Sequence, residues 1–70
     1  MHIYHIKRKD KPQEGEYKAF IICAKSSKEA LSLAKYFTEG SYWPEEEIAI
    51  ERIGVPYEGI NLGVIMESKE

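Results

Sequence analysis

The sequence predicts an α+β fold in the order β-β-α-β-β, with one helix packed on a small, mainly antiparallel sheet. Two segments rich in β-branched and aromatic residues precede a segment with helical periodicity, and two more strand-like segments follow it. Polar stretches that contain proline or glycine separate these segments. Because 70 residues suffice for only one small core, we expect a single domain over residues 1–70.

The first predicted strand is HIYHIKR, residues 2 to 8. Its side chains alternate, so that Tyr4 and Ile6 share one face and Ile3 and His5 share the other. We therefore expect a strand whose two faces differ in character.

The second predicted strand follows a polar connection. KDKPQEGE, residues 9 to 16, contains Pro12 and Gly15 and indicates a loop between two antiparallel strands. YKAFIICA, residues 17 to 24, is the most apolar run of the chain. Such continuity is typical of a central strand that is covered on both faces or of a strand at an oligomer contact.

A change of period marks the predicted helix, residues 26 to 37. Ser26 and Glu29 have the spacing of a capping box, in which each side chain satisfies a free backbone N–H group at the helix start. Gly40 is expected to end the helix, because glycine tolerates the left-handed conformation found there. The apolar stripe of this helix comprises Ala30, Leu33, Ala34 and Phe37.

Two further strands are expected in the second half. IAIERIG, residues 48 to 54, alternates, with Ile48 and Ile50 on one face and Glu51 on the other. A turn-rich connection, residues 55 to 61, leads to the last strand, residues 62 to 68. On a regular strand, one face would carry Leu62, Val64 and Met66.

One helix can cover only one face of the predicted sheet. The second strand nevertheless has apolar residues on both faces. One face is expected to carry Phe20, Ile22 and Ala24, and the other Tyr17, Ala19, Ile21 and Cys23. Either the long connections cover the second face, or another subunit does. We expect a homodimer or a higher homo-oligomer, because an exposed apolar sheet face favours aggregation.

Charge, cysteine content and hydropathy indicate the compartment in which the protein acts. Residues 1–35 carry a net charge of +4 and residues 36–70 a net charge of −6, so the chain is polarised in sequence. Cys23 is the only cysteine, which excludes an internal disulfide and fits a reducing compartment. No apolar run approaches the roughly 20 residues that cross a bilayer. We therefore expect a cytoplasmic protein that does not use a membrane as a partner.

Four stretches resemble a family of small, uncharacterised proteins of bacteria and their phages. They are HIYHIKRKD, EYKAFIICAKSSKEAL, a tryptophan before an acidic stretch, and IERIGVPYEGINLGVIMES. The resemblance spans nearly the whole chain and consists of patterning. It implies the same fold and a phage or mobile-element origin, and it brings no known activity with it.

No residue pattern indicates catalysis, a metal site or a cofactor. His2 and His5 fall on opposite faces of a strand, so they cannot share an ion. Cys23 lies in an apolar run, where a thiol behaves as a small hydrophobic side chain. We therefore expect a protein that is not an enzyme and that has no catalytic residues and no cofactor.

The sequence SYWPEEEI contains the first candidate binding surface, which comprises Tyr42, Trp43, Pro44, Glu45, Glu46 and Glu47. Trp43 either folds back over the helix end as a plug or serves as an aromatic anchor with an acidic rim, and one half-buried ring can do both. Combined with the missing catalytic pattern, this surface predicts a non-catalytic module that docks on a host protein, of which inhibition of host defence is one form.

The alternative is a nucleic-acid-binding protein. A short basic segment carries Lys7, Arg8, Lys9 and Lys11, which could contact phosphate groups. The simpler interpretation is that these charges keep the tip of a hairpin and its edge in water.

Overall fold

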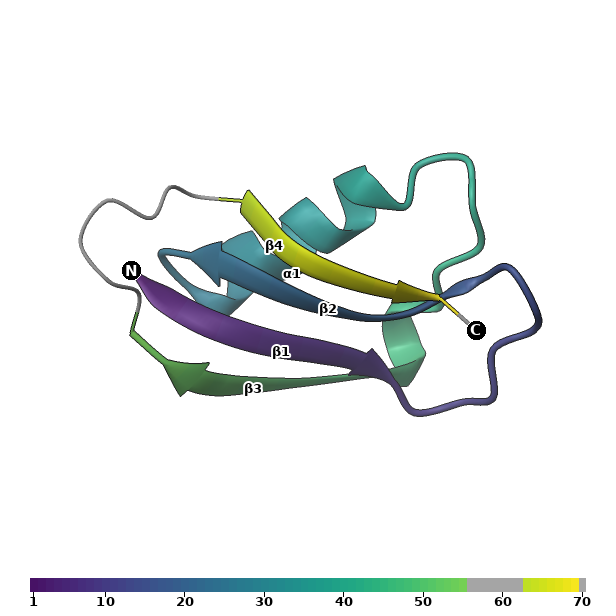
Figure 1. Cartoon of the computed structure of the whole chain (residues 1–70), viewed down its shortest axis with the longest axis horizontal. Coiled ribbons are helices and arrows are strands. Elements are labelled where there is room, and N and C mark those ends of the chain that lie inside the picture. Colours follow the sequence, from purple (N-terminus) through teal and green to yellow (C-terminus); the bar gives the residue numbers. More distant parts are fainter. Residues whose placement is uncertain (56–62, 70) are drawn as a thin grey trace.

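The computed structural model describes residues 1–55 and 63–69, which form one four-stranded sheet with one helix on it (Figure 1). The elements are β1 (His2–Arg8), β2 (Tyr17–Ala24), α1 (Ser27–Phe37), the 3-10 helix η1 (Glu45–Glu47), β3 (Ile48–Gly54) and β4 (Gly63–Lys69). The predicted α+β fold and the order β-β-α-β-β are confirmed. Within the part of the chain that the structure describes, no helix combines the length and the apolar character needed to cross a bilayer.

The sheet has the strand order β3-β1-β2-β4, and every neighbouring pair is antiparallel. The hairpin β1-β2 therefore lies in the centre, and the two strands of the second half lie at the edges (Figure 1). This position explains why β2 is so apolar. It also places basic β1 beside β3 from the acidic half, so the polarity of the sequence does not divide the sheet into a basic and an acidic half.

The core lies between α1 and one face of the sheet. Tyr4 pairs with Ile22 and Ile6 pairs with Phe20 across β1 and β2, which places these four side chains under the helix. Small residues of α1 allow a close approach of the helix to the sheet. The buried core consists of Tyr4, Ile6, Phe20, Ile22, Ala24, Ala30 and Ala34.

Local hydrogen bonds fix both ends of α1. The Ser26 hydroxyl accepts a hydrogen bond from the Glu29 backbone N–H at 3.2 Å, as the capping box predicts. The Glu29 carboxylate reaches one residue further back than expected and accepts from the Lys25 N–H at 3.0 Å. Beyond the helix, Gly40 has a φ of 86°, the left-handed conformation that glycine tolerates best.

The predicted face of the last strand is wrong. Val64 pairs with Ile22, whereas Met66 pairs with Ile21, so that the two side chains lie on opposite faces of the sheet. The register shifts between Ile21 and Ile22, which accommodates an extra residue in β4 and reverses the alternation. Leu62 and the predicted connection, apart from Val55, lie outside the described residues.

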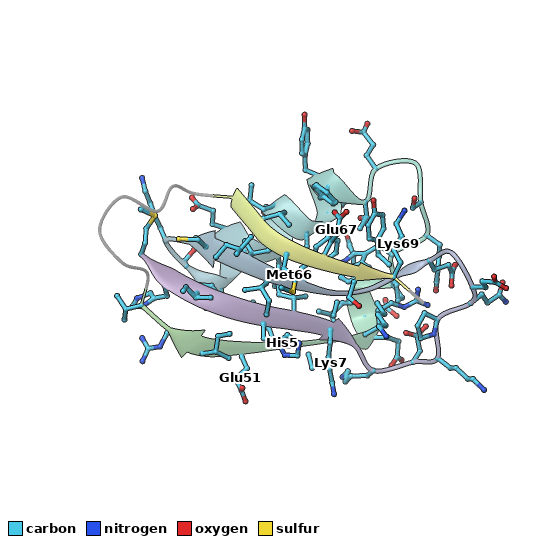
Figure 2. The ribbon with its side chains drawn as sticks, in the orientation of Figure 1. His5, Lys7, Glu51, Met66, Glu67 and Lys69 are labelled. Atoms are coloured by element: carbon cyan, nitrogen blue, oxygen red, sulfur yellow. The ribbon has the colours of Figure 1, made fainter. Side chains whose placement is uncertain are left out.

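The sheet face opposite α1 is called the open face below, and it points toward the viewer in Figure 1, where α1 lies behind the strands. Its central row crosses all four strands as Glu51, His5, Ile21 and Met66 (Figure 2). Apolar side chains on this side are partly in water, since Met66 is 63% exposed and Ile21 is only partly buried. Nothing within the described residues covers this face as α1 covers the other.

The difference in burial between Ile22 and Ile53 predicts the effect of a matched pair of substitutions. Ile22→Val should lower the free energy of unfolding by about 0.5–1.5 kcal/mol, because it removes a methylene group from a fully packed site. Ile53→Val removes the same group from a half-exposed position on an edge strand and should change the stability by less than about 0.5 kcal/mol. Urea denaturation measures both, and equal losses would contradict the assignment of the core to the helix side.

Candidate functional site

The loop from α1 to β3 places Trp43 against the core. The Ser41 N–H donates to the Thr38 carbonyl at 2.8 Å, which turns the chain directly after the helix. Pro44 is buried, and Trp43 is half-buried. The Trp43 ring meets the Phe20 ring edge to face, with centroids 5.2 Å apart at 72°. The interpretation of Trp43 as a plug over the helix end therefore fits this geometry.

Three further aromatic contacts extend this packing. Phe37 meets Phe20 at 5.5 Å and Tyr17 at 5.7 Å, both edge to face. Tyr17 also stacks on Phe20 at 5.4 Å, so its ring lies on the helix side. Alternation along β2 predicts the opposite face for Tyr17, and this expectation is wrong, because the register shifts between Tyr17 and Ala19.

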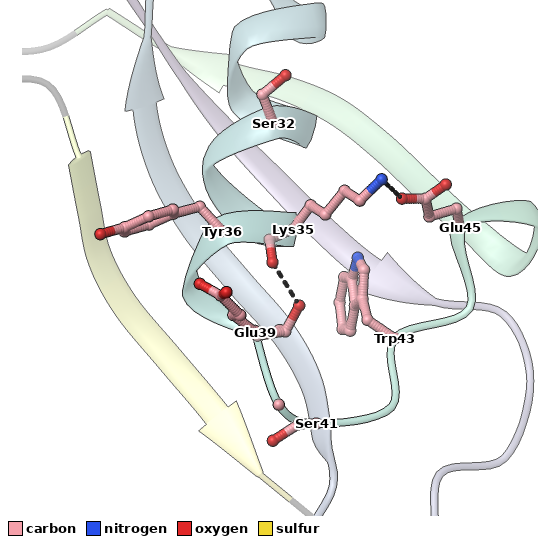
Figure 3. A pocket seen from close by; sticks show the side chains of 9 residues that line it. Ser32, Lys35, Tyr36, Glu39, Ser41, Trp43 and Glu45 are labelled. Carbon is pink, nitrogen blue, oxygen red and sulfur yellow. Dashed lines mark hydrogen bonds and ion pairs between the residues drawn. The ribbon is translucent and has the colours of Figure 1, made fainter.

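Trp43 also forms the wall of an open hollow of about 490 Å³ at the C-terminal end of α1 (Figure 3). A second hollow of about 250 Å³ borders the same ring toward Lys28 and Leu31. Trp43 is thus both a core contact and a surface that a ligand can reach. The larger hollow is lined by Ser32, Lys35, Tyr36, Thr38, Glu39, Gly40, Ser41, Trp43 and Glu45.

An ion pair spans the boundary between the two hollows. The Lys35 ammonium donates to a Glu45 carboxylate oxygen at 2.8 Å, as Figure 3 shows above the Trp43 ring. The hydrogen bond to Glu45, supported by its charge, raises the pKa of Lys35. Because the side chains are 71% and 58% exposed, the pair contributes little to stability and can open to admit a ligand.

Two exposed tyrosines belong to the hollows that Trp43 lines, Tyr36 to the 490 Å³ hollow and Tyr42 to a neighbouring one. Tyr36 projects from the last turn of α1 with 76% of its surface in water, and Tyr42 precedes Trp43 with 60% exposed. The Arg8 guanidinium lies over the Tyr42 ring, 5.2 Å from its centroid. We call Tyr36, Tyr42, Trp43 and the lining of the 490 Å³ hollow the Trp43 surface.

Arg8 is buried, and its guanidinium makes four hydrogen bonds. Its guanidinium donates to both Asp10 carboxylate oxygens, at 2.8 and 2.7 Å, and to Glu16 at 3.2 Å. A fourth hydrogen bond reaches the Tyr17 carbonyl at 3.3 Å. Arg8 therefore joins the β1-β2 loop to the start of β2 and, through Tyr42, to the loop that carries Trp43.

The burial of Arg8 removes one of the four residues of the predicted nucleic-acid surface. With only 2% of its side chain exposed, Arg8 cannot contact a phosphate without breaking its ion pairs. Of the four predicted residues, Lys7, Lys9 and Lys11 remain exposed. The basic segment therefore lacks the guanidinium that would give it bidentate phosphate recognition.

The other candidates for chemistry do not form a site. His5 lies on the open face and His2 on the helix side, as their alternation predicts. Cys23 is fully buried, and its sulfur lies 3.8 Å from the Met1 sulfur. In the range covered by the structure, no three histidine, cysteine or acidic residues gather as metal ligands would.

The six residues predicted from the sequence as a binding surface lie together. They line an open hollow of about 360 Å³, and Glu45, Glu46 and Glu47 form the exposed turn η1. The sequence interpretation did not include three residues of the Trp43 surface, Lys35 and Tyr36 from the last turn of α1 and Glu39 from the turn that follows it. Lys35 and Tyr36 lie outside the apolar stripe of the helix, which marks them as exposed, but only the fold shows that the loop returns to them.

Comparison of the chain with protein-family models, with curated proteins and with solved structures finds no match.

The Arg8 contacts predict an acid-sensitive contribution to stability. The hydrogen bond from Arg8 holds the pKa of Asp10 below its ordinary value of about 3.9. A carboxyl group whose pKa is lower in the folded than in the unfolded state stabilises the fold fully at any pH above the unfolded-state pKa. This contribution is lost as the pH falls through the folded-state pKa. Asp10→Asn should therefore make the stability less dependent on pH below about 4.

Asp10 is the only aspartate of the chain, so carbon-detected NMR can follow its titration without overlap. Arg8→Gln should return its midpoint toward the ordinary value, and the matched change Arg52→Gln on β3 should leave the midpoint in place. A normal midpoint in the wild-type protein would contradict the ion pair.

Proposed function

We propose that this protein is a non-catalytic binding module that docks on another protein through the Trp43 surface. The observation that carries the proposal is that a half-buried tryptophan borders two open hollows, each of which is also lined by an exposed tyrosine. Tryptophan and tyrosine are the residues most enriched at the energetic centres of protein interfaces.

The packing beneath the surface favours the same function. Trp43 rests on Phe20 and is therefore held in place before a partner arrives. A rigid aromatic anchor loses little conformational entropy on binding, which increases the affinity obtained per contact. The acidic turn η1 supplies a charged rim, which favours partners of opposite charge and speeds their association.

Two observations suggest the origin of the protein and the compartment in which it meets its partner. The resemblance to small proteins of bacteria and phages leads us to propose a phage or mobile-element accessory protein that acts on a host protein. The unpaired Cys23 fits a reducing compartment, so we place this interaction in the cytoplasm.

The open face supports a second proposal, self-association. Four strands about 4.8 Å apart and seven residues long at about 3.3 Å per residue give a face of roughly 440 Å². Two such faces bury about 900 Å², below the roughly 1,200 Å² at which stable interfaces begin. We therefore propose a weak homodimer that forms only at high concentration.

The docking proposal is tested by capture and affinity measurement. Tagged full-length protein is used to recover a partner from bacterial lysate, and the affinity of that partner is then measured with purified proteins. Tyr36→Ala should weaken binding by about tenfold or more, because it removes an exposed ring without touching the core. Met66→Ala, the matched exposed position on the open face, should bind normally. The reverse pattern would assign docking to the open face and reject the proposal.

The self-association proposal is tested by sedimentation equilibrium across a dilution from millimolar to micromolar protein. The wild-type mass should fall from dimer toward monomer, and Met66→Lys should be monomeric throughout, because a charge at this position cannot be buried cheaply. Leu31→Lys, a similar change on the helix side, should behave as wild type. A monomer at every concentration, or a dimer that survives Met66→Lys, would contradict closure of the open face by a second copy.

A further inference from the structure

We propose that the hollow beside Trp43 receives the guanidinium group of an arginine side chain from the partner protein. This inference rests on the proposed docking function and names the chemistry that the Trp43 surface recognises. Three features of the hollow favour it: unbalanced negative charge, an aromatic wall and a size suited to one side chain.

The charge of the hollow is negative. Its lining contains Glu39, Glu45 and a single basic residue, Lys35, whose ammonium is already neutralised by Glu45 at 2.8 Å. No ion pair of Glu39 occurs among the residues that the structure describes. The C-terminal end of α1, which opens into the same hollow, adds the negative end of the helix dipole. This negative potential repels an anionic ligand and attracts a cation.

The aromatic wall selects among cations. Tryptophan gives the strongest cation–π attraction of the aromatic side chains, and Trp43 lines the hollow. A guanidinium is planar, is more weakly hydrated than an ammonium, and stacks on aromatic faces while its N–H groups reach carboxylates. Arginine can therefore combine stacking on Trp43 with hydrogen bonds to a carboxylate of the lining, Glu39 or Glu45, which a lysine ammonium does less well.

Size and hydrogen bonding fit a side chain with its adjoining backbone. The volume of about 490 Å³ lies within the roughly 300–1,000 Å³ of pockets that hold small ligands. Figure 3 shows the indole nitrogen on the side of the Lys35–Glu45 pair. This N–H makes no hydrogen bond within the described ranges, which leaves it able to donate to a backbone carbonyl of the bound segment.

Lys35 competes with the incoming arginine for the Glu45 carboxylate. Its ammonium occupies Glu45, the carboxylate that an incoming guanidinium would also contact. Because the pair is exposed, exchange of Lys35 for the ligand costs little. Removal of the lysine charge should therefore tighten binding, an effect opposite to the one expected for an anion-binding hollow.

The probe is the tripeptide acetyl-Gly-Arg-Gly amide, titrated into ¹⁵N-labelled full-length protein at physiological salt. Trp43 is the only tryptophan, so its indole N–H gives a single NMR signal that reports on the hollow. We expect saturable movement of this signal, and a much weaker response to the glutamine tripeptide of the same length. Lys35→Gln should tighten binding about two- to fivefold, and Glu39→Gln should weaken it by a similar factor.

The matched control is Glu51→Gln, which changes the net charge equally but lies on the open face. It should leave the affinity for the arginine peptide unchanged. Equal weakening by Glu39→Gln and Glu51→Gln would show a diffuse charge effect and overturn the assignment. If the corresponding lysine tripeptide bound as tightly as the arginine tripeptide, recognition of a guanidinium would be overturned. If the glutamine tripeptide bound as tightly, recognition of a cation would be overturned.

Failure of this inference differs from failure of the docking function. A partner protein lost on Tyr36→Ala, together with no response to the arginine peptide, would leave docking intact and reject arginine as the anchor. Saturable arginine binding without any protein partner would support the site and reject the docking function.

Discussion

The edge-to-face contact between Trp43 and Phe20 is the interaction on which the candidate site depends. Phe20 is fixed at the centre of the sheet by β1 and by the small residues of α1. By packing on it, Trp43 brings the loop after α1 back to the helix end, and the hollow is the space left between them. The same ring therefore packs on the core and lines the hollow, so the core and the proposed binding surface share one residue.

The polar contacts of Arg8 hold the same end of the molecule together. Its bidentate pair with Asp10 and its position over Tyr42 connect the β1-β2 loop with the Trp43 loop at the same end of the molecule. A buried guanidinium is stable there only because carboxylate and carbonyl oxygens satisfy its donors. Because Arg8 is committed to these contacts, the basic segment lacks its guanidinium for contact with phosphate groups.

The two proposed contact surfaces are compatible because they lie on different sides of the sheet. The Trp43 surface is formed by α1 and its following loop, whereas the open face lies on the other side of the four strands (Figure 1). Self-association through the open face would leave both Trp43 surfaces of a dimer accessible. Two linked copies of a weak anchor bind a repeated or dimeric partner more tightly than one copy does, without new contacts.

The sequence alone determined the order of the elements and most of the core, because alternation, helical period and the Ser26 cap are local signals. Tertiary structure decided the rest. The register shifts in β2 and β4 moved Tyr17 and Met66 to unexpected faces, since bulges depend on the neighbouring strand. Only the folded chain brings Lys35, Tyr36 and Glu39 to Trp43 and commits Arg8 to Asp10, because the return of a loop and the partners of a charge are set by packing rather than by spacing.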